Sequence, residues 1–476
     1  MKTPHLIAVP CLAAWMLSLQ AQAVFSTTSI ASVDSVFTDT VYADTLVIDS
    51  VSPELPWDEA VRYQLDKMVN SKLFETTQLG MIIWDLDADS CLFRHNERHR
   101  LRPASTQKTV TAIAALDLLG ASHQFKTELR YSGKIEQRVY PLESLDSARL
   151  QSEAAQQLSA PNSQLSTLNS PPSTLNLATP SLNREGWGGS PSTLSGSLYL
   201  VGGMDPLFDE TDIKVLASAV KTLGVDTITG NIYEDRSFKH TDKWGEGWCW
   251  DDDNPNLSPL LVGGKDMAAT RLLSELRSLG IVVMGGIGEA TAPAGTKLIG
   301  TRTHAMDDVL VPMMKRSDNW YAESLFYQLA NRLGGKGATV KPARNYIDQL
   351  VTRAGADQKL IHVADGSGLS LYNYVTPDME LKLLRYAWKN SEIIEKFYPS
   401  LPIAGVDGTL KNRMKGTKAQ GNVHAKTGTV TGVSALAGYC TASNGHHLCF
   451  SIINQGIPKA KIGRDFQDAV CTLLCR

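Results

Sequence analysis

Both ends of the chain carry the same combination of elements, an amphipathic helix next to a pair of strands. Apolar residues recur at helical spacing over 56–73, and strand candidates follow at 80–86 and 91–93. Near the other end, strand candidates at 434–442 and 447–453 precede a final amphipathic helix. Because a sheet must cover its apolar face, this pattern predicts an α/β (α+β) fold. In it, one sheet is built from both chain ends and covered by the two terminal helices.

Between these ends the character of the sequence changes. Residues 151–196 are rich in Ser, Thr, Asn, Gln and Pro, and Ser-Thr-Leu-Asn occurs twice, at 166–169 and 173–176. We interpret this stretch as a surface loop, because it holds too few apolar residues to build a core. The elements expected after it are strands at 198–203 and 227–233 and helices at 211–223, 319–333 and 377–389.

Length and composition exclude several classes of protein. The chain has 476 residues, 43% of them hydrophobic and 20% charged, which are ordinary values for a soluble globular protein. The length predicts about three domains, or one domain that carries a large insertion. Its 46 Lys and Arg residues against 49 Asp and Glu residues give a net charge of −3. This balance lacks the excess of basic residues that is typical of nucleic-acid-binding proteins.

The first 23 residues have the pattern of a secretory signal peptide. Lys2 is followed by an apolar run over 6–19 and by the small-residue cleavage pattern Ala21-Gln22-Ala23. Cys11 lies inside the apolar run, which argues against a lipoprotein. No later segment has 18 uninterrupted apolar residues, so we expect an exported chain without a transmembrane segment after cleavage.

Six cysteines follow the signal peptide, an even number that permits disulfides in an exported protein. A two-residue turn at Asn444-Gly445 would place Cys440 opposite Cys449 in the terminal hairpin. The pair is then either a disulfide or two packed thiols. Cys471 and Cys475 are four residues apart on the final helix and are expected in the core.

The first motif with chemical content is Ser105-Thr106-Gln107-Lys108, at the start of a helix expected over 105–119. This spacing places the serine and the lysine on one helix face, one turn apart. A serine needs a neighbouring base to act as a nucleophile, and a lysine kept neutral by burial can be that base. The spacing alone is weak, since Ser218 and Lys221 share it in the middle of an ordinary amphipathic helix.

The second motif is Ser317-Asp318-Asn319, immediately before the helix expected over 319–333. Ser181-Leu182-Asn183 has the same pattern but lies in the low-complexity stretch, where we give it no role.

The third motif is Lys426-Thr427-Gly428, on a strand candidate. A lysine can hold a carboxylate by charge, and a glycine in a strand allows another backbone or a ligand to approach closely.

Each motif also has a purely structural interpretation. Ser105 and Ser317 could be helix N-caps, and Lys426 could be a solvated strand residue. The three motifs together, in this order and each at a fitting element, are much harder to obtain by chance. This ordered trio is the signature of penicillin-binding proteins and class A β-lactamases.

The chain resembles the D-alanyl-D-alanine carboxypeptidase/endopeptidase family of low-molecular-mass penicillin-binding proteins, the peptidase S13 type. The similarity covers most of residues 55–476. Besides the trio, with Pro103-Ala104 before Ser105, the similar stretches are LYLVGGMDP (198–206), ITGNIYEDRSF (228–238), GWCWDDD (247–253), KRSDN (315–319), DGSGLS (365–370), LPIAGVDGTLKNR (401–413) and HAKTGTVTGVSALAGY (424–439). The chain departs from the family at Met204, where glycine is frequent, and at Leu371, where a basic residue is frequent.

The resemblance implies a serine β-lactamase/transpeptidase-like domain with a large inserted region between the first and second motifs. The insertion has less foldable sequence than two full extra domains need. The implied division is a signal peptide (1–23), a spacer (24–54), a catalytic domain (55–122 and 300–476) and an insertion (123–299) that includes the loop at 151–196.

The resemblance also implies a mechanism without metal or other cofactor. Ser105 would attack the D-Ala-D-Ala peptide bond or the β-lactam carbonyl, and Lys108 would take the hydroxyl proton. Backbone N–H groups of Ser105 and Thr429 would hold the oxyanion. Ser317 would pass the proton to the leaving amine with help from Lys426.

The remaining implied roles concern the substrate. Asn319 would position the substrate amide and the Lys108 amine, and Lys426, Thr427 and Thr429 would bind the terminal carboxylate beside Gly428. The implied partners are peptidoglycan stem peptides, with β-lactams as covalent inhibitors. The expected location is the periplasm, with the protein soluble or loosely membrane-associated.

Two alternatives remain open from the sequence. A serine β-lactamase shares the trio, but we find no Glu-x-x-Leu-Asn element between the second and third motifs, and the chain is long for that class. A non-catalytic peptidoglycan-binding protein of the same fold would have no reason to keep the whole trio. Carboxypeptidase and endopeptidase activities are not separable from the sequence.

Overall fold

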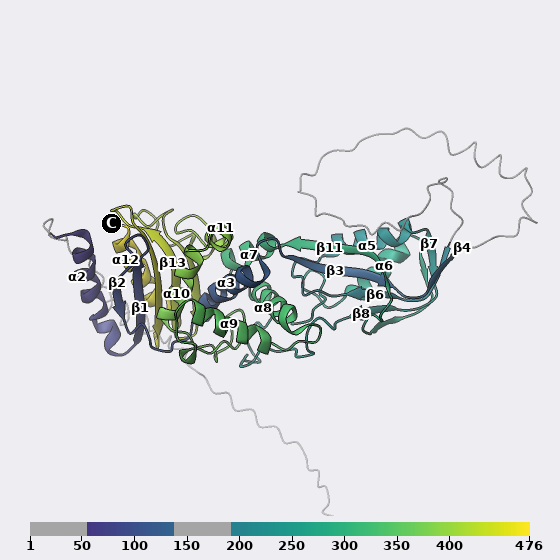
Figure 1. Cartoon of the computed structure of the whole chain (residues 1–476), viewed down its shortest axis with the longest axis horizontal. Coiled ribbons are helices and arrows are strands. Elements are labelled where there is room, and N and C mark those ends of the chain that lie inside the picture. The colour runs from purple at the N-terminus through teal and green to yellow at the C-terminus, as the bar shows by residue number, and fades with distance from the viewer. Residues whose placement is uncertain (1–54, 138–191) are drawn as a thin grey trace, which may run out of the picture. The chain divides into compact units, whose positions relative to one another are not determined.

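The computed structural model describes residues 55–137 and 192–476 (Figure 1). The predicted signal peptide, the spacer and residues 151–191 of the low-complexity stretch lie outside these ranges. None of the helices in the described ranges has the length and apolarity needed to cross a lipid bilayer.

One five-stranded antiparallel sheet joins the two ends of the chain, as predicted. The pairing of β14 with β1 connects them over the full length of β1. In spatial order the strands are β12 (His424–Val430), β13 (Val433–Thr441), β14 (His447–Gln455), β1 (Gln78–Asp85) and β2 (Ser90–His95). β12 is therefore an edge strand of this sheet.

The terminal helices α2 (Trp57–Val69) and α12 (Ala460–Leu474) pack into one apolar cluster with one face of this sheet. The strand side chains alternate between the two faces: Leu436 and Cys440 of β13 join this cluster, whereas Ala437 and Tyr439 join the cluster on the opposite face. Cys471 and Cys475 are buried here too, which confirms them as core residues.

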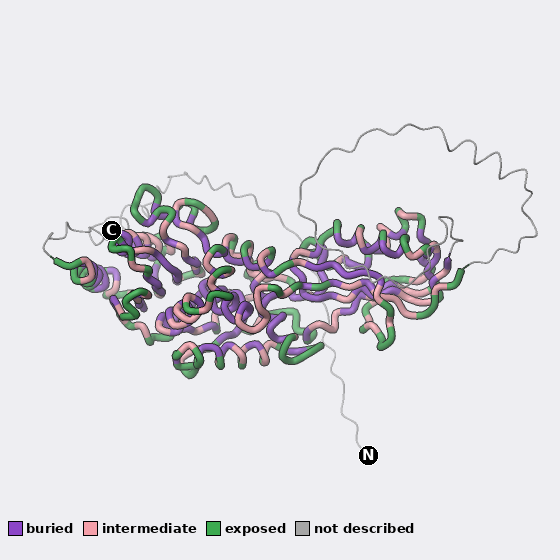
Figure 2. The backbone as a smooth tube through the Cα atoms, turned by 45° about the horizontal axis from the view of Figure 1, so that its top comes forward, coloured by how far each residue is buried: buried purple, intermediate pink, exposed green. Residues whose placement is uncertain are grey.

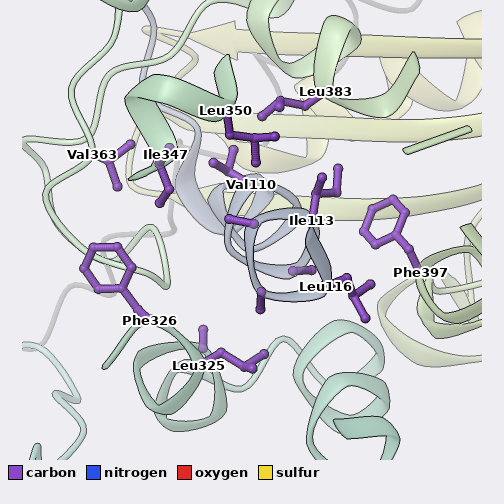
Figure 3. Close-up of a cluster of buried hydrophobic side chains, with 14 of the residues drawn as sticks. Val110, Ile113, Leu116, Leu325, Phe326, Ile347, Leu350, Val363, Leu383 and Phe397 are labelled. Atoms are coloured by element: carbon purple, nitrogen blue, oxygen red, sulfur yellow. The ribbon is translucent and has the colours of Figure 1, made fainter. Parts of the chain in front are cut away.

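A layer of helices covers the other face of the sheet. It contains α3 (Gln107–Leu119), α7 (Met306–Lys315), α8 (Asn319–Gly334), α9 (Lys341–Arg353), α10 (Pro377–Trp388) and α11 (Ser391–Ser400). Figure 3 shows α3 inside this layer, with Val110, Ile113 and Leu116 surrounded by apolar side chains of neighbouring helices. Every residue of α3 from Gln107 to Leu116 is buried, as expected of a helix that packs on all sides.

A second group of strands lies between α3 and α7 in the sequence. A five-stranded sheet contains β10 (Ile287–Glu289), β8 (Ile232–Asp235), β6 (Leu198–Val201), β3 (Gln124–Tyr131) and β11 (Lys297–Ala305), in that order. A four-stranded sheet contains β4 (Lys134–Gln137), β5 (Ser192–Ser195), β7 (Val225–Ile228) and β9 (Val282–Val283). Helices α5 (Glu210–Thr222) and α6 (Ala268–Ser278) share one apolar core with them, and Figure 2 shows the buried stretches along these strands.

Three expectations for this region need correction or comment. The single strand expected over 227–233 is two strands in different sheets, because the chain turns at Gly230, where a Cβ would lie 2.5 Å from the Gly196 carbonyl oxygen. Residues 192–195 of the expected loop form β5, which buries Leu194. The predicted division between residues 299 and 300 falls inside β11, and the domain limits stay a prediction.

The predicted pairing of Cys440 with Cys449 is wrong, and both thiols are free. The turn has three residues, 443–445, and its last residue is a glycine at φ +88°. Ala442 N–H donates to the His446 carbonyl at 2.8 Å and closes this longer loop. One extra loop residue shifts the register by one, so the two cysteine side chains lie on opposite faces of the sheet.

The contact between the two chain ends can be tested at Phe466. This fully buried side chain of α12 packs edge-to-face on Phe74, with ring centroids 4.9 Å apart. Phe466→Ala should lower the free energy of unfolding by about 3–5 kcal/mol, because it leaves a cavity in the core. Denaturant unfolding measures this loss. Lys461→Ala, on the exposed side of the same helix, should cost about 0.5 kcal/mol or less, and equal losses for both variants would contradict the packing described.

Candidate active site

The serine of the first motif lies in a strained turn that opens α3. Residues Ala104–Thr106 form one turn of 3-10 helix, and Ala104 has φ +46°, an uncommon value for a residue with a side chain. Thr106 is the N-cap of α3 and makes no side-chain capping bond, so the interpretation of Ser105 as a simple cap finds no support. Strain of this kind persists only where surrounding contacts enforce it.

A buried carboxylate behind the turn provides such contacts. Thr106 Oγ1 lies 2.9 Å from the Pro103 carbonyl oxygen and 2.5 Å from Glu380 Oε1, and Ser451 Oγ donates to Glu380 Oε2 at 2.7 Å. Burial raises the pKa of Glu380 to about 7, although both hydroxyls favour its charged form. The sequence analysis did not identify Glu380, which looks like any acidic residue of an amphipathic helix.

The lysine of the first motif is completely buried, and its amine meets three oxygen atoms. Lys108 Nζ lies 3.0 Å from Ser105 Oγ, 2.7 Å from Asn319 Oδ1 and 2.7 Å from the Ser367 carbonyl oxygen. These atoms come from the α3 turn, from the start of α8 and from a loop before α10. The structure therefore brings the first and second motifs together, as predicted, and adds Ser367.

Burial and the neighbouring carboxyl groups act in opposite directions on the pKa of Lys108. Burial lowers its pKa from 10.5 to about 8, while the carboxyl groups of Asp365, Glu323 and Asp318 act in the opposite direction. Burial also raises the pKa of Glu323 to about 8, which weakens its negative field near neutral pH. With this pKa a fraction of the lysine is neutral near physiological pH, and that fraction can take up a proton.

The loop that supplies the Ser367 carbonyl is fixed by two buried carboxyl groups. Glu323 Oε1 accepts from the N–H groups of Gly366 (3.1 Å) and Ser367 (2.9 Å). Asp365 accepts from Gly368 N–H at 2.7 Å and from Trp248 Nε1 at 2.8 Å. These bonds give the DGSGLS stretch the role of positioning the Ser367 carbonyl. The sequence analysis noted the stretch but did not predict this role.

The second and third motifs also meet. Lys426 Nζ donates to Ser317 Oγ and to the Thr427 carbonyl oxygen, both at 2.8 Å. Ser317 has φ +61°, so it does not act as a regular cap residue, and Asp318 instead caps α8 through Trp320 N–H at 2.9 Å. Burial and the nearby Lys108 hold the pKa of Lys426 well below its ordinary value.

Gly428 is where the β12 edge approaches the nucleophile turn. A Cβ built on Gly428 would lie 2.5 Å from the Pro103 carbonyl oxygen and 3.1 Å from Ser105 N. The sequence analysis expected a close approach here, and the approaching group is the backbone before Ser105. Thr429 follows on the same edge strand, which places its backbone at the cleft beside the serine.

A cleft of about 380 Å³ opens over these groups. Its lining includes the hydroxyls of Ser105, Ser317, Thr427, Thr429 and Thr409, and Thr427 Oγ1 donates to Thr409 Oγ1 at 2.8 Å. Two arginines, Arg413 and Arg464, complete the lining. Thr409 and Arg413 belong to a stretch noted in the sequence, whereas a single arginine on the final helix gave no signal.

The second Ser-x-x-Lys pair behaves as expected of an ordinary helix. Ser218 and Lys221 are exposed on α5, and neither lines the cleft. Ser181-Leu182-Asn183 lies outside the described residues.

This arrangement of a serine beside a buried lysine and an edge strand is that of a serine hydrolase without a histidine next to its serine. The chain belongs to the D-Ala-D-Ala carboxypeptidase 3 (S13) family, whose profile matches residues 61–142, 188–261 and 261–476. The resemblance seen in the sequence is thereby confirmed.

Individual relatives agree with this assignment. The D-alanyl-D-alanine carboxypeptidase of Actinomadura sp. (strain R39) is 26% identical over 493 residues, which cover 83% of this chain and 81% of the relative. DacB, a D-alanyl-D-alanine carboxypeptidase of Haemophilus influenzae, is 34% identical over 186 residues, or 38% of this chain and 39% of the relative.

The fold has solved counterparts. The crystal structure of penicillin binding protein 4 (dacB) from Haemophilus influenzae superposes with a TM-score of 0.66 at 21% identity, covering 84% of this chain and 97% of that chain. A complex of the same protein with a β-lactam superposes with a TM-score of 0.61 at 23% identity. The transpeptidase-like fold predicted from the sequence is confirmed by this similarity.

The close approach at Gly428 leads to a test. Gly428→Ala would force the β12 edge away from the Pro103–Ser105 backbone and misplace the serine relative to the cleft. We expect about a 100-fold slower covalent reaction of the protein with a fluorescent penicillin, because small misplacements at a reacting centre cost that much. Gly286→Ala is the matched control, since no atom lies within 4 Å of its added Cβ. Equal labelling rates for both variants would contradict the geometry.

Proposed function

We propose that this chain is an exported serine D-alanyl-D-alanine carboxypeptidase that cleaves peptidoglycan stem peptides through an acyl-enzyme on Ser105. The observation that carries the proposal is the buried Lys108 amine, 3.0 Å from Ser105 Oγ and bonded to two further acceptors. Membership of the S13 family and the names of its relatives support the substrate class.

A count of protons on the Lys108 amine assigns its role. A neutral amine has two N–H groups and one lone pair. Asn319 Oδ1 and the Ser367 carbonyl oxygen can only accept, so they take both N–H groups. The lone pair is then left for the third neighbour, the Ser105 hydroxyl. Ser105 O–H donates to Lys108 Nζ, and the lysine is the general base.

The acylation step follows from this polarity. Ser105 Oγ attacks the carbonyl carbon of the scissile bond while its proton moves to Lys108 Nζ. The N–H groups of Ser105 and Thr429 then stabilise the oxyanion. The close packing of Gly428 on the nucleophile turn supports this pair of donors, because it keeps the edge strand and the turn in contact.

Collapse of the tetrahedral intermediate needs a proton on the leaving amine. Ser317 Oγ, which accepts from Lys426 Nζ, gives its own hydroxyl proton to the amine and recovers one from Lys108. Lys108 is neutral again at the end of this step. Water then attacks the acyl carbon, Lys108 takes one proton from it, and the return of that proton to Ser105 Oγ releases the acid.

The remaining cleft groups bind substrate. Asn319 holds the Lys108 amine and faces the substrate amide, and Thr427 and Thr429 offer hydroxyls to the terminal carboxylate. Penicillin presents a carbonyl and a carboxylate in a similar relation, so we expect it to acylate Ser105 as a slowly released inhibitor. We also propose endopeptidase activity on cross-linked dimers and a periplasmic location.

A serine β-lactamase is the second candidate, since the trio and the fold are common to both classes. It requires rapid turnover of penicillin, whereas the proposed carboxypeptidase should retain a stable adduct. A scaffold protein that only binds peptidoglycan would release no D-alanine at all.

The catalytic pair has a matched control within the same chain. Ser105→Ala and Lys108→Ala should each lower D-alanine release from purified muropeptides by at least about 1000-fold, since each removes one half of the nucleophile–base unit. Ser218→Ala and Lys221→Ala have the same spacing on an exposed helix and should keep wild-type rates. D-alanine release by the Ser105→Ala variant at a rate near that of the wild type would contradict the assignment of Ser105 as the nucleophile. Scoring monomer trimming and dimer cleavage in one digest separates the two peptidase activities.

The pKa of Lys108 predicts a pH profile. Because the base must be neutral, acylation should rise about tenfold per pH unit below pH 8 and level off above it. Asn319→Asp would place a carboxylate next to the Lys108 amine, which favours the charged form of the amine. The rising part of the pH profile should therefore move to higher pH by about one pH unit or more. Stopped-flow acylation by a chromogenic β-lactam measures both profiles. A limb that stays in place in the variant would exclude Lys108 as the group that titrates.

A further inference from the structure

The cleft presents hydroxyls to a substrate carboxylate, but hydroxyls carry no positive charge to compensate it. Lys426 is fully buried, and its amine already bonds to Ser317 Oγ and the Thr427 carbonyl. Burial and the nearby Lys108 both disfavour its charged form and lower its pKa. Lys426 is therefore a weak source of charge for a ligand in the open cleft.

Arg413 lines the cleft but is neutralised within the protein. Its guanidinium bonds to Asp468 Oδ1 through Nε at 2.9 Å and through Nη2 at 2.7 Å, and it also bonds to Gln467 Oε1 at 3.1 Å. These bonds tie the 401–413 stretch to α12. They occupy Nε and Nη2 and pair the positive charge of Arg413 with the Asp468 carboxylate.

Arg464 is the other arginine of the cleft lining, and it has no such partner. In residues 55–137 and 192–476, its guanidinium forms neither a hydrogen bond nor an ion pair with protein groups. Two acidic residues of α12 are paired with other cations, Asp468 with Arg413 and Asp465 with Lys461 at 2.6 Å. Arg464 acts on the Asp468 carboxyl only through its charge, without a bond. Arg464 is half-buried and lines the cleft.

The backbone of Arg464 is also held in place. Arg413 Nη2 donates to the Arg464 carbonyl oxygen at 3.2 Å, which links the two arginines. Arg413 thus fixes the helix, and the planar guanidinium of Arg464 keeps its N–H donors for an anion.

We propose that Arg464 is the specificity-determining residue that binds the free carboxylate next to the scissile bond, together with the Thr427 and Thr429 hydroxyls. This inference rests on the proposed function, because the ligand is the C-terminal carboxylate of a D-Ala-D-Ala peptide or the matching carboxylate of a β-lactam. A guanidinium binds a carboxylate through two parallel bonds, which would select acids over their neutral analogues.

The test compares an acid with its neutral analogue, so that it reads the carboxylate alone. We would measure kcat/KM for a peptide ending in D-Ala-D-Ala and for the same peptide ending in D-Ala-D-alaninamide. Acylation rates by benzylpenicillin and by its methyl ester form a second pair. Arg464→Gln should slow the reactions of both acids by about tenfold or more and those of both neutral analogues by less than about twofold.

Two variants complete the design. Lys461→Gln removes the same charge three residues away on α12, outside the cleft lining, and should leave both ratios unchanged. Arg464→Lys restores the charge without the fork and should recover part of the preference for acids. Equal slowing of acid and neutral analogue by Arg464→Gln, or no slowing of either, would overturn the proposal.

The two substrate pairs also separate this proposal from the proposed function. If the wild type released no D-alanine from either peptide, the proposed peptidase would fail. The penicillin pair would still report on Arg464, and its selective slowing or its absence would decide the inference.

Discussion

The site depends on one buried lysine amine. When this amine is neutral, it has fewer N–H groups than it has oxygen neighbours. Lys108 Nζ meets Ser105 Oγ, Asn319 Oδ1 and the Ser367 carbonyl oxygen, and the last two can only accept. This arrangement both orients the lone pair toward the serine and joins three distant segments of the chain. The sheet formed from the two chain ends and the all-round packing of α3 hold these segments in place.

Burial of charge explains the rest of the site's design. Lys108 and Lys426 lie in one site, and an ordinary ammonium pair there would be strongly unfavourable. Burial favours the neutral amine in both, while Asp365 and Glu323 limit the shift at Lys108. The same two carboxyl groups fix the loop that supplies Ser367, so the groups that influence the pKa of the base also position one of its acceptors.

Local motifs predicted much of the fold and most of the site. The trio was recognisable because its spacing has a chemical reason, and the helix at 105–119 and the joined ends followed from apolar periodicity. The contribution of Ser367 was not predictable, because a backbone carbonyl leaves no residue signature. Among the residues that the structure describes, Arg464 has no bonded acid because Arg413 and Lys461 pair with the carboxylates of α12, and only the three-dimensional contacts determine that.

The hairpin shows a different limit. Asn-Gly is a strong two-residue turn signal, yet one additional loop residue moved Cys440 and Cys449 to opposite faces of the sheet. Core packing decides such a register, since Cys440 joins the α12 side and Cys449 joins the helical layer. The residues around the turn do not by themselves determine the strand register.

The protonation state of Lys108 is the central claim, and NMR titration of lysines labelled with 13C at Cε tests it most directly. Burial lowers the pKa of Lys239 to about 8 as well, so the Lys108→Arg variant is needed to identify the right resonance. We predict a resonance that titrates near pH 8 in the wild type and is missing from the variant. A Lys108 resonance that stays in its charged position up to pH 10 would contradict the account.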